Sequence, residues 1–193
     1  MKFISPRQLL TYAAVAALFL LADPMRATYA AGCVLALSGI LLRVWGCGHL
    51  RKNEELVTSG PYAHVKHPLY LGTFLIALGG IVAAGSPRLP GLLLWIVAGP
   101  VFLGAFFGYY LPKKKRVEGE RMARFFGGRY AEYARNVPDF LPSPAPWAGA
   151  SRQPWDYATF RRNHEIGMDL LVAGMFAAIL LLPPVLQAFL RRP

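Results

Sequence analysis

The chain has 193 residues, of which 55% are hydrophobic and 16% are charged, and its formal net charge is +11. A soluble domain of this length usually has about a quarter of its residues charged, so the composition excludes an ordinary soluble globular protein. The basic residues flank apolar segments, where they would meet anionic lipid first, so the charge does not indicate a nucleic-acid-binding protein.

Five apolar blocks have lengths near the roughly 20 residues that a helix needs to cross a bilayer. They lie at 5–22, 27–46, 69–86, 89–111 and 166–190. A short turn, Gly85-Ser86-Pro87-Arg88, joins the third block to the fourth and predicts an antiparallel hairpin. The first block continues into the second without a small-residue cleavage site, which argues against a cleaved signal peptide. We therefore expect an all-α integral membrane protein, with about five transmembrane helices in one domain, 1–193.

The basic residues predict the orientation of these helices. If the N-terminus is cytoplasmic, 17 of the 21 Lys and Arg residues face the cytoplasm, as the positive-inside rule expects. The chain should then lie in an inner or cytoplasmic membrane. Cys33 and Cys47 fall at opposite ends of the second block, too far apart to pair, and no metal-binding cysteine spacing is present.

A polar motif stands directly before the third apolar block. Residues 60–72 read G-P-Y-A-H-V-K-H-P-L-Y-L-G and hold His64, Lys66, His67 and Tyr70. Proton-exchanging groups at the mouth of a membrane helix are costly to keep there, so they indicate a functional site. The alternative is an ordinary loop leading into a helix, with interfacial side chains that reach toward water.

The second polar segment, 112–165, begins with an expected amphipathic helix over 116–136 and continues as a proline-rich loop over 138–156. Glu118 and Glu120 should open this helix, where carboxylates complement its dipole. Glu120 is spaced to pair with Arg124, whereas Glu118 points toward the aromatic stripe. The members of that stripe are Met122, Phe125, Phe126, Tyr130 and Tyr133.

A third polar group, Asn163-His164-Glu165, precedes the last apolar block. It fits a helix N-cap, with Asn163 as the capping residue, at least as well as a ligand-binding role. An antiparallel hairpin returns the chain to the side it left, so both long polar segments should emerge on one membrane face. We therefore expect the catalytic region, 47–165, to close one cofactor pocket on the cytoplasmic side.

These motifs resemble a known family. The motif at 60–72, followed after a hairpin by E-G-E-R-M-A-R-F-F-G-G-R-Y-A-E-Y-A-R-N-V-P from Glu118, is similar to the isoprenylcysteine carboxyl methyltransferase family, in a wider group with the phospholipid N-methyltransferases. The resemblance implies a helical membrane enzyme without a Rossmann domain. It also implies S-adenosylmethionine as the methyl donor and a cofactor pocket closed by loops at the cytoplasmic helix ends.

The family's motifs also imply site residues. Its Arg-His-Pro-x-Tyr falls on Lys66, His67, Pro68 and Tyr70, its first glutamate on Glu118, and its Phe-Gly-x-x-Tyr-x-x-Tyr on residues 126–133. The implied catalytic residues are Lys66, His67 and Tyr70. The implied cofactor-binding residues are His64, His67, Tyr70, Glu118, Tyr130 and Tyr133, and we assign the acceptor to Arg135, Asn136, His164 and Glu165.

Three departures from the family pattern bear on the acceptor. Lys66 stands for a usual arginine, Gly119 for a second glutamate, and Asn136 for a frequent arginine before Val-Pro. A guanidinium grips a carboxylate with two parallel hydrogen bonds, and neither lysine nor asparagine does so. The motifs therefore support the methyltransferase group more firmly than a carboxylate acceptor, and O-, N- and S-methylation stay open.

Several functions remain open from the sequence alone. The first is a methyltransferase that acts on an amphiphilic small-molecule or lipid acceptor. Its other partners would be the surrounding membrane lipids, with no metal and no obligate protein partner. The second is a phospholipid N-methyltransferase, and the third is a sterol-type membrane reductase using NADPH, whose His-Pro-x-Tyr region is similar. The last is a non-catalytic membrane scaffold, which would bind no small molecule.

Overall fold

The structure is a computed structural model that describes residues 16, 18–51, 54–164 and 166–190. Within these residues every regular element is helical, and no strand is present. The elements are α2 (Arg26–His49), η1 (Gly60–Ala63), α3 (Pro68–Ala84), α4 (Gly91–Leu93), η2 (Leu94–Ala98), α5 (Gly99–Ala105), η3 (Phe106–Tyr110), α6 (Leu111–Asn136), α7 (Tyr157–Asn163) and α8 (Ile166–Leu190).

Three of the described helices are long and apolar enough to cross a membrane: Arg26–His49, Gly91–Asn136 and Ile166–Pro183. They confirm the second, fourth and fifth apolar blocks and an integral membrane protein. The third block forms α3, a shorter apolar helix. The first block, 5–22, lies largely outside the described residues.

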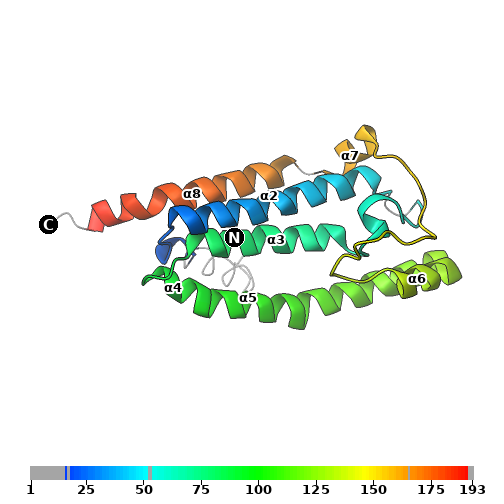
Figure 1. Ribbon diagram of the computed structural model, residues 1–193, viewed down its shortest axis with the longest axis horizontal. Helices are drawn as coiled ribbons and strands as arrows, with labels where there is room; N and C mark the ends of the chain where they lie inside the picture. Colours follow the sequence, from blue (N-terminus) through cyan, green and yellow to red (C-terminus); the bar gives the residue numbers. More distant parts are fainter. Residues whose placement is uncertain (1–15, 17, 52–53, 165, 191–193) are drawn as a thin grey trace, which may run out of the picture.

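The long helices run side by side, with α3 between α2 and the α4–α5 segment, and α8 along α2 (Figure 1). α3 and the helix that begins at Gly91 form the predicted hairpin. The polar segments gather at one end of the bundle, where α2 ends, α3 begins, and α6 and α7 lie (Figure 1). A buried apolar cluster from α2, α3, η2 and α8 fills the other half; it includes Ala36, Ala83, Leu94 and Ile179.

α2 and α3 touch backbone to backbone at two pairs of glycines. A Cβ at Gly32 would lie 2.4 Å from the Gly79 carbonyl oxygen, and a Cβ at Gly39 would lie 2.5 Å from the Gly72 carbonyl oxygen. The glycines of each helix are seven residues apart, so both contacts lie on one face. Small residues allow membrane helices to approach this closely, and van der Waals packing then holds them together.

The helical segments α4, η2, α5, η3 and α6 follow one another without a loop from Gly91 to Asn136, with a kink at Gly127. The prediction of a separate amphipathic helix opened by Glu118 and Glu120 is therefore wrong: both residues lie inside a helix that has already left the apolar segment. Residues 111–116, which include four consecutive basic residues, are themselves helical. The apolar part of the helix therefore continues into its polar part without a turn.

The long helix breaks instead at Gly127. There the backbone adopts φ 51° and ψ −126°, a left-handed conformation that glycine reaches without a steric penalty. The chain resumes as helix to Asn136, so the last two turns point in a new direction. Residues 137–156 then form the predicted non-helical loop, which leads into the short helix α7.

α7 was not predicted, and its caps correct the expectation for Asn163. Asp156 is the N-cap of α7, and its carboxylate accepts a hydrogen bond of 2.7 Å from the Thr159 amide. Asn163 ends this helix, and its side-chain amide donates to the Cys47 and Leu50 carbonyls at the end of α2. It therefore ties α7 to α2 and does not cap α8.

The glycine contact gives a first test of the fold. We expect Gly39→Ala to lower the stability of the detergent-purified protein by about 1–3 kcal/mol, because its methyl group would overlap the Gly72 carbonyl. Gly104→Ala is the matched control, since a Cβ there meets no other atom within 4 Å. Thermal unfolding monitored by intrinsic fluorescence measures both. Equal stability of the two variants would contradict the close approach of α2 and α3.

Candidate functional site

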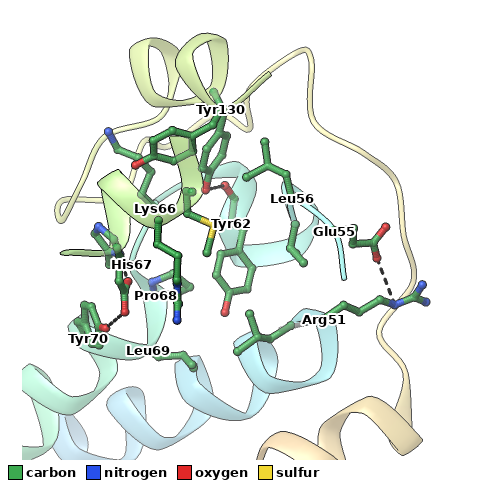
Figure 2. A pocket seen from close by; sticks show the side chains of 16 residues that line it. Arg51, Glu55, Leu56, Tyr62, Lys66, His67, Pro68, Leu69, Tyr70 and Tyr130 are labelled. Carbon is green, nitrogen blue, oxygen red and sulfur yellow. Dashed lines mark hydrogen bonds and ion pairs between the residues drawn. The ribbon is translucent and has the colours of Figure 1, made fainter. Parts of the chain in front are cut away.

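A pocket of about 340 Å³ opens at the polar end of the bundle (Figure 2). This volume lies within the usual range of small-molecule sites, about 300–1,000 Å³. Its walls come from the end of α2, the loop to α3, the start of α3 and both parts of α6. The lining residues are Leu50, Arg51, Glu55, Leu56, Val57, Tyr62, Lys66, His67, Pro68, Leu69, Tyr70, Glu118, Arg121, Met122, Tyr130 and Tyr133.

The two sequence motifs meet in this pocket at Glu118. Its carboxylate accepts a hydrogen bond from the Tyr70 hydroxyl, and its other oxygen lies 3.4 Å from His67 Nδ1. The rings of His67 and Tyr70 stack with centroids 5.3 Å apart, and Figure 2 shows them side by side. One carboxylate from α6 therefore orients two side chains from the start of α3, across 48 residues of sequence.

Local backbone geometry explains why these side chains point together. His67 is the N-cap of α3 and Pro68 follows it at the first helical position, where proline's missing N–H costs nothing. Proline also biases the preceding residue out of the α region, and His67 has φ −123° and ψ 60°. The imidazole is thus held beside the helix start, within reach of the carboxylate on α6.

Lys66 lines the pocket, but its ammonium already has partners. Lys66 Nζ lies 2.7 Å from Asp139 Oδ1 and donates a hydrogen bond of 2.9 Å to the Ala134 carbonyl. Asp139 also pairs with Lys115 from α6. Burial alone would raise the pKa of Asp139, but hydrogen bonds from Lys115 and Lys66 outweigh it and hold that pKa below its usual range. Lys66 therefore fastens the loop before α3 to the end of α6.

The tyrosines form the aromatic wall of the pocket. The Tyr133 hydroxyl donates to the Tyr62 carbonyl at 2.9 Å, so the part of α6 beyond Gly127 is bound to η1. The rings of Tyr130 and Tyr133 lie 6.4 Å apart. Burial raises the pKa of Tyr62 well above its usual range. This phenol therefore stays protonated and serves as a wall, not as a base.

The backbone of the proline-rich loop is hydrogen-bonded to the motif at 60–72. The Lys66 amide donates to the Pro138 carbonyl at 2.8 Å, the Ser143 amide to the His64 carbonyl at 2.9 Å, and the Trp147 amide to the Ala63 carbonyl at 2.9 Å. These bonds follow the loop along the motif at 60–72. The backbone of the motif is thus held by the loop at 138–147, while its side chains His67 and Tyr70 are held by Glu118 on α6.

Several predicted site residues lie outside the pocket lining. His64 Nδ1 lies 2.8 Å from the Ser143 carbonyl oxygen, while Arg135 and Asn136 bond to carbonyls of their own helix. His164 Nε2 lies 2.6 Å from Asp169, and its ring stacks on Phe160. Glu165 falls outside the described residues.

The pocket wall that faces His67 and Tyr70 was not predicted from the sequence. Arg51 and Glu55 form an ion pair of 3.3 Å there, beside Leu56 (Figure 2). Val57 also lines the pocket. Nothing in their spacing signals a site. Arg121 could have been found, because it follows Glu118 by three residues and therefore shares its helix face.

Comparison with known proteins identifies related sequences. The model of the isoprenylcysteine carboxyl methyltransferase (ICMT) family matches residues 15–104, which include the motif at 60–72. No solved structure matches the chain. The alternatives considered from the sequence are not favoured by these comparisons.

The curated relatives carry two kinds of name. The cobalt-zinc-cadmium resistance protein CzcN of Cupriavidus metallidurans is 33% identical over 63% of this chain and 52% of its own length. The nickel-cobalt-cadmium resistance protein NccN of Alcaligenes xylosoxydans xylosoxydans is 31% identical over 67% and 59%. The protein-S-isoprenylcysteine O-methyltransferase of Schizosaccharomyces pombe is 35% identical over 47% and 34%. The chain thus spans about a third to three fifths of these relatives.

The Lys66–Asp139 contact predicts a pH-dependent stability. A depressed carboxyl pKa stabilises the fold above the usual aspartate value of 3.8, and this stabilisation is lost as the pH falls through the lower folded value. We expect Asp139→Asn to lower the melting temperature at pH 7, with the difference from wild type shrinking below pH 4. The control is Glu120→Gln, an exposed residue on the same side of the kink as Lys115. A pH-independent difference for Asp139→Asn would contradict the ion pair.

Proposed function

Since the chain belongs to the isoprenylcysteine carboxyl methyltransferase family, we propose that it is a membrane methyltransferase that uses S-adenosylmethionine and acts on a lipophilic or lipid-like acceptor. The observation that carries this proposal is the meeting of Glu118 with His67 and Tyr70. Residues from both family motifs, far apart in sequence, line one pocket at the polar end of the bundle.

The pocket residues fit the chemical groups of this cofactor. Its ammonium needs an anion, and Glu118 is the carboxylate nearest the His67–Tyr70 stack. Its adenine needs flat apolar surfaces, and the rings of Tyr130 and Tyr133 offer them along the wall. When bound, the cofactor supplies an electrophilic methyl group, which is the demanding part of the chemistry.

The chain's own residues then have three tasks: to position, to orient and to exclude water. Glu118 fixes the His67 ring through Nδ1 and the Tyr70 ring through its hydroxyl, so both are oriented before any ligand enters. The loop at 138–147 is hydrogen-bonded to the backbone of 63–66 and so holds the segment before His67 in place. His67, Tyr70 and Glu118 are therefore the residues to which we assign the reaction, and Lys66 we reassign to positioning.

The acceptor that we propose is amphiphilic. Two metal-resistance names among the relatives state no activity, whereas the O-methyltransferases are named for an isoprenylated cysteine. The apolar side chains of Leu50, Leu56, Leu69 and Met122 line the pocket and offer contacts to a lipid chain. A lipid-modified molecule would place its head group near Glu118 and its chain against these side chains. Because the positive-inside rule places the face with most Lys and Arg residues in the cytoplasm, we assign the pocket to the cytoplasmic face.

Cofactor binding tests the proposal directly. We expect S-adenosylmethionine or S-adenosylhomocysteine to raise the melting temperature of the detergent-purified protein, because a ligand that binds only the folded state stabilises it. NADPH at the same concentration should leave the melting temperature unchanged. Stabilisation by NADPH alone would replace the methyltransferase with a reductase, and no stabilisation by either would favour a scaffold.

The carboxylate at the centre of the site gives a sharper test. We expect Glu118→Gln to weaken S-adenosylhomocysteine binding tenfold or more, since the ligand ammonium would lose a charge-assisted contact, which is worth about 1.5–3 kcal/mol. The same change at Glu120 should have little effect, because Glu120 is exposed and outside the pocket lining. Isothermal titration in detergent compares the two. Equal losses would mean that both carboxylates act through the stability of α6 and not through the site.

A further inference from the structure

The cationic side chains that line the pocket differ in whether they already have a hydrogen-bond or ion-pair partner. Lys66 is engaged by Asp139 and by the Ala134 carbonyl, and Arg51 pairs with Glu55 at 3.3 Å. Asn136, which stands where the family often has an arginine, bonds to the Glu132 carbonyl on its own helix. The positions expected from the family to hold an anion are therefore occupied by contacts within the protein.

Arg121 differs from these residues. It lines the pocket from α6, one turn after Glu118 and next to Met122. Among the residues that the structure describes, it has neither a hydrogen bond nor an ion pair. Arg121 is exposed and lines the pocket, with an electrostatic interaction with Tyr70, so its guanidinium is accessible to an anionic ligand group.

We propose that Arg121 binds a carboxylate of a ligand in this pocket and so replaces the family arginines absent at Lys66 and Asn136. The inference rests on the proposed function, in which both the cofactor and an isoprenylcysteine-type acceptor carry a carboxylate. A guanidinium holds a carboxylate with two parallel hydrogen bonds, in a geometry that fixes the orientation of the ligand as well as its position.

The surroundings of Arg121 agree with this role. Glu118, on the same helix face, contacts His67 and Tyr70, and among the described residues no ion pair joins it to Arg121. A ligand that spans the pocket could then place an ammonium near Glu118 and a carboxylate near Arg121. The two charges of an amino-acid group would each meet an opposite charge from one helix.

The test uses the full chain in detergent with pairs of ligands, one of which lacks the carboxylate: 5′-methylthioadenosine lacks the whole amino-acid group of the cofactor product, and the carboxamide lacks only the acceptor's carboxylate. The variants are Arg121→Gln and Arg121→Lys, with Arg124→Gln as control, because Arg124 is exposed on the next turn and does not line the pocket. One arm measures the affinity for S-adenosylhomocysteine and for 5′-methylthioadenosine, which lacks the amino-acid carboxylate. The other measures KM for an N-acetylated isoprenylcysteine and inhibition by its carboxamide.

The two arms identify which carboxylate is bound. If it belongs to the cofactor, Arg121→Gln loses about tenfold or more in affinity for S-adenosylhomocysteine but not for 5′-methylthioadenosine. If it belongs to the acceptor, KM for the acid rises by a similar factor while carboxamide inhibition and cofactor affinity stay unchanged. Arg121→Lys should retain part of the affinity, since it keeps the charge but loses the paired hydrogen bonds.

Two other results are informative in different ways. If Arg121→Gln matches Arg124→Gln in both arms, while melting curves show that both are folded, the inference is overturned. If the wild-type protein itself binds no S-adenosylhomocysteine, the proposed function fails first, and that failure is visible before any variant is made.

Discussion

The close contact of α2 with α3 determines where the pocket lies. Gly32 and Gly39 of α2 meet Gly79 and Gly72 of α3, so the two helices approach at backbone distance and cannot shift along each other without steric overlap. The end of α2, which Arg51 follows by two residues, is thereby fixed beside the start of α3, which His67 caps. The pocket walls on either side of the 50–67 segment are built on this pair.

The second determinant is the break at Gly127. The long helix carries Glu118 past the end of α3, and without a break it would continue away from the bundle. The left-handed glycine redirects its last two turns, so that Tyr133 reaches the Tyr62 carbonyl and Lys66 reaches Ala134 and Asp139. The spacing from Gly127 to Tyr130 and Tyr133 therefore has a physical meaning: a turn, followed by two rings on one helix face.

The sequence predicted the parts of this molecule that depend on periodicity and on turn chemistry. Apolar length gave α2, α8 and the start of the long helix, and His67-Pro68 gave the start of α3. It did not predict how far the long helix continues, because a run of lysines is compatible with either a helix or a loop. Nor did it predict the partner of Lys66, since Asp139 is distant in sequence and carries no motif.

The unbroken helix from Gly91 to Glu118 also sets the distance of the pocket from the apolar part of the helix. Glu118 follows Leu111 by seven residues, or about 10 Å along a helix that rises 1.5 Å per residue. With Leu111 at the edge of the hydrocarbon core, this distance places the carboxylate at the outer edge of the head-group layer or just beyond it, since that layer is roughly 6 Å deep on each side. The lipid-like acceptor that we propose would reach the pocket by lateral diffusion in the membrane and extend its head group to this level. Its effective concentration would then be counted per area of bilayer and would not depend on its solubility in water.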